Sequence, residues 1–75
     1  MPSRPSPGAE RAGTVAEFDE HRGLGVVKGA DGTWYPFHCT QIAGGSRTIP
    51  VGAAVRFAVR PGGLGRWEAA AIETV

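Results

Sequence analysis

The sequence has one cysteine, Cys39, and lacks both a second cysteine and a third histidine. An internal disulfide is therefore excluded, and a tetrahedral zinc site of the usual kind lacks ligands. No apolar run approaches the roughly 18 residues that cross a bilayer, and the first residues lack the apolar stretch of a secretory signal. We expect a soluble, cytoplasmic protein with no cofactor, no bound metal and no membrane contact.

An excess of charge of either sign is also lacking. The 75 residues carry eight Lys and Arg side chains and seven Asp and Glu side chains, and from Gly13 onward six basic residues are matched by six acidic ones. Proteins that bind polyanions usually carry a clear basic excess. Any electrostatic binding must therefore come from local arrangement, and we expect it to be weak.

Features of an enzyme are scarce. A chain of roughly 60 ordered residues buries only about 60% of its extended surface, so a deep active site is not expected. His38 beside Cys39 suggests a base and a nucleophile, but neighbours on a strand point to opposite faces and cannot share a proton. The glycines at 62, 63 and 65 precede no helix, which a phosphate loop requires. We therefore expect no enzymatic activity and no catalytic residues.

The chain divides into a tail and a domain. Residues 1–12 contain three prolines, two serines and a glycine but no large apolar residue after Met1, so we predict that they are disordered. From residue 13 to 75 short alternating runs are separated by turn residues, which is typical of a small all-β domain. The predicted strands are 13–19, 23–28, 33–38, 53–60 and 67–74.

The connections indicate how these strands pair. Asp31-Gly32 predicts a tight hairpin between the second and third strands because both residues tolerate positive φ. Five short strands with a long third connection favour a five-stranded antiparallel barrel of the oligonucleotide-binding (OB) class, with no long helix. An SH3-like barrel has similar strands, and the pattern alone does not separate the two. The side chains that alternation turns inward are Tyr35, Phe37, Val55, Phe57, Val59, Ala70 and Ile72.

Three motifs follow one another at a recognisable spacing. The first is Gly13-Thr14-Val15-x-x-Phe18-Asp19, the second is Arg22-Gly23-Leu24-Gly25-Val26-Val27, and the third is Tyr35-Pro36-Phe37-His38-Cys39-Thr40-x-Ile42. Together they resemble the bacterial cold-shock domain family, and the likeness extends over residues 13–75. The resemblance implies an OB barrel that binds single-stranded DNA or RNA. Bases would stack on aromatics of the second and third strands, and basic residues would contact phosphates.

Most of the family's stacking aromatics are replaced in this chain. Arg22 keeps a basic position, His38 keeps the histidine and Phe18 keeps one aromatic. Stacking contributes about 1 to 3 kcal/mol per base, so losing four platforms removes roughly 4 kcal/mol or more, on the order of 1,000-fold in affinity. We therefore expect weak binding. The positions that lose an aromatic are Glu17, Leu24, Val26, Pro36 and Cys39.

Two tryptophans are candidates to replace the lost platforms. By alternation Trp34 shares the outer face with His38; the alternative is that its ring covers an edge of the barrel. Trp67 lies beside Arg66 after the glycine-rich loop, and the alternative there is a ring that caps the barrel's open end. The predicted nucleic-acid site comprises Phe18, Arg22, Leu24, Val26, Trp34, His38, Arg66 and Trp67.

Two functions compete. The first is a single-stranded RNA- or DNA-binding protein, a cold-shock-like RNA chaperone or regulator that acts as a monomer. The second is a protein-interaction module that keeps the barrel and has lost nucleic-acid binding. Its support is the aliphatic pair Leu24 and Val26, which would form a dry patch suited to a protein partner.

Overall fold

The computed structural model describes residues 10–75, which form five strands and three single turns of 3-10 helix. Among these residues there is no α-helix, and no helical segment is long and apolar enough to span a membrane. The strands are β1 (Glu10–Asp19), β2 (Leu24–Gly29), β3 (Trp34–His38), β4 (Ala54–Pro61) and β5 (Trp67–Thr74). The turns are η1 (Cys39–Gln41), η2 (Ala43–Gly45) and η3 (Gly63–Gly65).

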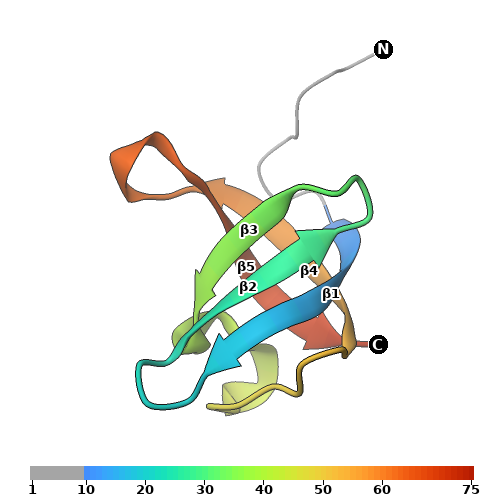
Figure 1. Cartoon of the computed structure of the whole chain (residues 1–75), viewed down its shortest axis with the longest axis vertical. Coiled ribbons are helices and arrows are strands. Elements are labelled where there is room, and N and C mark those ends of the chain that lie inside the picture. Colours follow the sequence, from blue (N-terminus) through green and yellow to red (C-terminus); the bar gives the residue numbers. More distant parts are fainter. Residues whose placement is uncertain (1–9) are drawn as a thin grey trace.

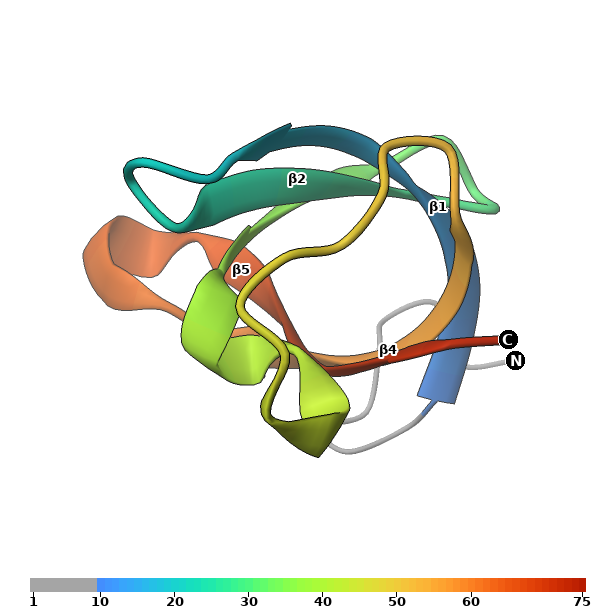
Figure 2. The same cartoon turned by 90° about the horizontal axis from the view of Figure 1, so that it is seen from below.

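The strands form one antiparallel sheet in the order β3-β2-β1-β4-β5. The sheet curls so that its two edge strands approach each other, and the strands surround a common axis (Figures 1 and 2). No ladder of hydrogen bonds joins β3 to β5 in the described part of the chain, so the barrel keeps an open seam. An isolated parallel bridge joins Ile42, which directly follows η1, to Ile72 of β5. The segment that contains η1 lies at the lower end of the barrel in Figure 1. The predicted all-β, five-stranded barrel of the OB class is confirmed.

The predicted strand bounds agree with the structure to within one residue, except at the start of β1. Residues 10–12 were predicted to be disordered, which is wrong. Arg11 pairs with Phe57 of β4, and Ala12 pairs with Arg56. Pairing through the main chain needs no large apolar side chain, so the polar composition of this segment did not reveal it. The rest of the predicted disordered tail, residues 1–9, lies outside the described residues.

The core lies inside the curled sheet, and side chains alternate between core and solvent along β3 and β4 as predicted. Two further core residues, Ile42 and Ile49, come from the long connection between β3 and β4. Figure 2 shows this connection crossing the lower end of the barrel. The main cluster consists of Val15, Val27, Tyr35, Phe37, Ile42, Ile49, Val55, Phe57, Val59, Ala69 and Ile72.

The hairpin between β2 and β3 has a different turn from the predicted one. Of its two turn residues only Gly32 has a positive φ, 84°. The Gly32 N–H donates to the carbonyl of Gly29 at 2.9 Å, and the Asp31 Oδ1 accepts from the N–H of Thr33 at 2.9 Å. One left-handed glycine is therefore enough, because the Asp31 side chain closes the rest of the turn.

β5 also departs from regular alternation. Ala70 and Ile72 are both buried, as predicted, but Ala70 lies opposite Ala58 and is outside the main cluster. The residue before it, Ala69, is buried as well and lies opposite the buried Val59. A register shift in the β4–β5 ladder then returns Ile72 to the core. Next to Ile72, Ala71 has a φ of 49°. It is the only non-glycine residue with positive φ in the described part of the chain, which identifies a β-bulge.

Ala71→Gly should stabilise the barrel by about 1 kcal/mol, because glycine adopts the left-handed conformation without the steric cost that alanine has there. Urea unfolding measures the change. Ala54→Gly is the matched control, since Ala54 is also exposed but has no positive φ. The control should lose about 0.5 to 1 kcal/mol. A loss of stability in Ala71→Gly equal to that of the control would contradict strain at the bulge.

Candidate nucleic-acid interface

The outer face of the β2–β3 hairpin is largely accessible to solvent. Its exposed residues are Leu24, Lys28, Trp34 and His38, and its half-buried residues are Val26 and Pro36. Tyr35 and Phe37 point inward and are buried, and Trp34, Pro36 and His38 are on the other side, as alternation predicted. Trp34 is 55% exposed. Its cross-strand neighbour is Lys28, whose Nζ lies 5.7 Å from the centroid of the Trp34 ring. The outward pairs along the hairpin are Leu24 with His38, Val26 with Pro36, and Lys28 with Trp34.

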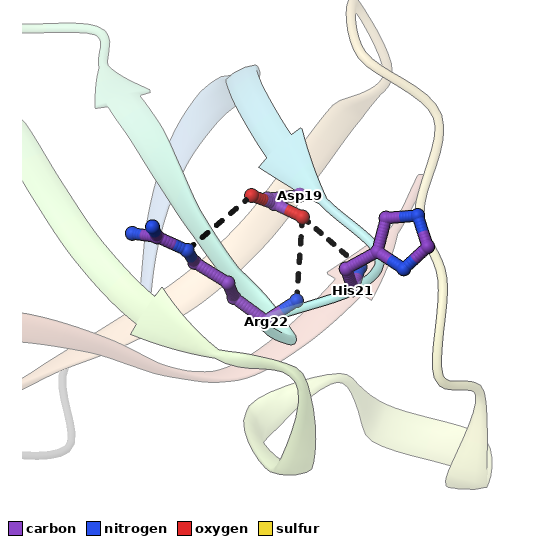
Figure 3. A network of polar contacts seen from close by, with 3 residues as sticks. All are labelled: Asp19, His21 and Arg22. Carbon is purple, nitrogen blue, oxygen red and sulfur yellow. Dashed lines mark hydrogen bonds and ion pairs between the residues drawn. The ribbon is translucent and has the colours of Figure 1, made fainter.

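Arg22 lies in the turn between β1 and β2, and Asp19 fixes this turn (Figure 3). The Asp19 Oδ1 accepts hydrogen bonds from the N–H of His21 at 3.0 Å and of Arg22 at 3.3 Å. The Arg22 Nε lies 3.9 Å from the Asp19 Oδ2, and the arginine side chain is 76% exposed. Asp19 thus orients Arg22 toward solvent while offsetting part of its charge.

A hollow of about 350 Å³ is lined in part by Arg22. We call it the lower hollow, because the β1–β2 turn lies at the lower end of the barrel in Figure 1. The predicted residues Arg22, Leu24 and Val26 line it together with Pro36, and Phe18 and Phe37 contribute aromatic rings. Two acidic residues, Glu17 and Asp19, line it against the single arginine. This lower hollow is therefore largely apolar and net acidic, so Arg22 is the one described residue lining it that could contact a phosphate.

Phe18 is not a free stacking platform. Its ring stacks on the buried Phe37 with centroids 5.9 Å apart and an angle of 9° between the planes, and it is partly buried against the core. Gly25 permits this packing, because a Cβ atom there would lie 2.5 Å from the Phe37 Cζ and 2.7 Å from the Glu17 carbonyl oxygen. The second glycine of the Gly23-x-Gly25 motif is thus required by packing.

A second hollow, of about 520 Å³, is lined by residues of the β2–β3 hairpin and by Arg66 and Trp67 at the end of the β4–β5 loop. We call it the upper hollow, because the hairpin and this loop both project at the upper end of the barrel in Figure 1. It brings together three predicted residues, Trp34, Arg66 and Trp67. Arg11 of β1 lines it as well, and sequence reasoning missed this residue because it was assigned to the tail. Pro36 lines both hollows, so the two adjoin across β3.

Of the described residues that line this upper hollow, Asp31 is the one acidic residue. Its carboxylate lies 3.8 Å from the Arg11 Nη1. The hydrogen bond from the Thr33 N–H lowers the pKa of Asp31, and the Arg11 charge acts in the same direction. The upper hollow therefore holds two arginines against one carboxylate that stays ionised, and it is net basic.

His38 lines neither hollow. Its Nδ1 accepts a hydrogen bond from the N–H of Thr40 at 3.2 Å, and this bond caps η1. The same Nδ1 lies 3.0 Å from the Thr40 hydroxyl. The Cys39 Sγ lies 3.9 Å from the same Nδ1, so the prediction that these side chains point to opposite faces is wrong. The reason is that the chain leaves the strand at His38 and enters η1. Because Nδ1 already accepts a backbone N–H, it is poorly placed to act as a base for Cys39.

The surface cations are largely matched by nearby carboxylates. Arg56 lies 3.8 Å from Glu73, and Arg60 lies 3.9 Å from Glu68, in addition to the pairs of Arg11 and Arg22. Exposed pairs of this kind contribute about 0 to 1 kcal/mol each. Among residues 10–75 no three His, Cys, Asp or Glu side chains are grouped so that they could hold a metal ion.

Neither a protein-family model nor a curated protein matches this chain significantly. The resemblance to the cold-shock domain therefore stays a prediction that rests on the residues quoted above and agrees with the observed barrel.

Proposed function

We propose that the chain binds single-stranded nucleic acid, RNA or DNA, with weak affinity, as a cold-shock-like RNA chaperone or regulator. One observation carries the proposal: Trp34 is exposed on the outer face of β2 and β3, beside Lys28. An exposed indole next to a cation suits an unstacked base and its phosphate. The barrel class and the motif resemblance support the same function.

The second candidate is a protein-interaction module, and the lower hollow favours it. Leu24 is 47% exposed there beside Val26, and Glu17 and Asp19 border the apolar surface. A protein segment with apolar and basic side chains would complement this surface better than a polyanion would. We rank it second because Trp34 and Trp67, the two largest exposed side chains of the described residues, lie outside this hollow.

Titration of a fluorescently labelled oligothymidine and a matched RNA at two salt concentrations tests the proposed function. We expect dissociation constants that are micromolar or weaker, because the domain has no net charge and few aromatics. We also expect only a modest fall in affinity with salt, since few phosphates are contacted. Nanomolar binding would show that the lost aromatic platforms contribute less than about 1 kcal/mol each to affinity. An absence of binding to both probes at millimolar protein would favour the protein-interaction module.

Trp34→Ala should weaken binding by about 1 to 3 kcal/mol, the contribution of one stacking platform. Arg22→Ala should chiefly reduce the salt dependence, because its exposed guanidinium would contact a phosphate. Anisotropy titrations of the labelled oligonucleotides measure both. Val51→Ala is the control, since Val51 is an exposed apolar residue that lines neither hollow. Equal effects of Trp34→Ala and Val51→Ala would argue against stacking on Trp34.

The double variant Leu24→Phe/Val26→Phe should bind more tightly than the natural chain. Both side chains point away from the core, so each phenylalanine would add a stacking surface at little cost in stability. The same titrations and a thermal melt measure the two effects. No gain in affinity, in a variant that still folds, would favour the protein-interaction candidate.

A further inference from the structure

The seam between β3 and β5 differs at its two ends. At the lower end the bridge between Ile42 and Ile72 closes it. At the upper end no such bridge exists among residues 10–75, and the hollow of about 520 Å³ occupies this position. The first residue of β3, Trp34, and the first residue of β5, Trp67, both line it. They are the only two tryptophans of the chain.

Each indole is anchored on its own strand. The Lys28 Nζ lies 5.7 Å from the centroid of the Trp34 ring, and Trp34 lines the hollow whereas Lys28 does not. Trp67 pairs with Pro61 and is 43% exposed. The loop before it is closed by a hydrogen bond from the Gly62 N–H to the Arg66 carbonyl at 2.6 Å. The two rings therefore come from β3 and β5, which are the two edge strands of the sheet.

Charge around the rings is suited to an anion. Arg66 immediately precedes Trp67, and Arg11 reaches the hollow from β1. The Arg11 Nε is buried and has no hydrogen-bond partner within the described residues. Asp31 offsets only one of the two arginines. Exposed indole rings and net positive charge thus occur together here. The lower hollow instead has net negative charge, and its two phenylalanines, Phe18 and Phe37, pack against or within the core.

We propose that the upper hollow takes one unpaired nucleobase between Trp34 and Trp67, with the adjoining phosphate on Arg66 or Arg11. This inference rests on the proposed function and deepens it: the strand is anchored at the upper end of the barrel instead of along the whole β2–β3 face. Stacking accepts any base, so recognition is tolerant of sequence. A base inside a duplex is stacked and paired, so the site selects single strands.

Intrinsic tryptophan fluorescence tests this directly, because both tryptophans report on the same hollow. Oligothymidine should quench the emission on titration, and an abasic oligonucleotide of equal length should leave it nearly unchanged, since it offers phosphates without bases. Trp67→Ala should weaken binding of the labelled oligothymidine by about 5- to 150-fold. Trp67→Phe, which keeps an aromatic ring, should recover most of the loss and guards against a variant that fails to fold.

Arginine and aspartate variants test the phosphate contact. Arg66→Ala should weaken binding, whereas Arg47→Ala should not, because Arg47 is exposed and lines neither hollow. Asp31→Asn keeps an oxygen that can accept from Thr33 and frees Arg11, so binding should strengthen. Its salt dependence should steepen by up to about 0.7 in the logarithmic slope, the value for one phosphate of a single strand.

The outcomes separate this inference from the proposed function. Binding detected by anisotropy without tryptophan quenching, and unaffected by Trp67→Ala, would overturn the base site and leave the proposed function standing. Equal quenching by the abasic oligonucleotide would also overturn it, since phosphates alone would then account for binding. No binding of either probe would overturn both. Quenching by a proline-rich peptide and not by oligothymidine would assign the hollow to a protein ligand and overturn both as well.

Discussion

The fold depends on a steric constraint at Gly13. This residue pairs with Gly29 of β2 on one side and with Val55 of β4 on the other, so β1 belongs to both halves of the sheet at this point. A Cβ atom there would lie 2.6 Å from the Lys28 carbonyl oxygen and 2.8 Å from the Phe57 ring. Only glycine lets the backbone come this close to the core, and the sheet can then bend around Phe57 and enclose its own interior.

The position of the candidate site depends on how the two edge strands of the bent sheet meet. The two edge strands approach without forming a ladder, and the only bridge along the seam in the described chain joins Ile42 to Ile72. The seam is therefore closed by this bridge at one end and carries exposed tryptophans at the other. Because β3 borders this seam with one edge and pairs with β2 on the other, its outward residues reach both hollows, and Pro36 marks the boundary between them.

Features with a local cause were predictable from the sequence. The period of two along β3 and β4 identified Tyr35, Phe37 and Phe57 as core residues, and the turn residues located the hairpins. The bulge at Ala71 was not predictable, because alanine gives no signal of positive φ. Ile49 was missed because an isolated apolar residue in a long connection shows no period.

The upper hollow was predictable only in its parts. Trp34 was placed on the outer face by alternation, and Trp67 was recognised as a candidate beside Arg66. That the two line one hollow depends on the closure of β5 toward β3, which no local pattern encodes. Arg11 was missed because residues 1–12 were treated as a single polar segment. The last three residues of that segment pair with β4 through the backbone. These misses share a cause, since each concerns a contact between segments distant in sequence.

The ion pairs on the surface have a kinetic consequence. Arg11, Arg22, Arg56 and Arg60 each lie within 4 Å of a carboxylate, so their charges form short dipoles whose fields decay faster with distance than those of isolated cations. Such a surface does not steer a charged partner from afar, and association should proceed at about 10⁵ to 10⁶ M⁻¹s⁻¹ instead of the roughly 10⁸ to 10⁹ M⁻¹s⁻¹ of steered encounters. Occupancy is then governed by how long a partner remains after an unguided collision, and that residence time is determined by contacts of a few ångströms.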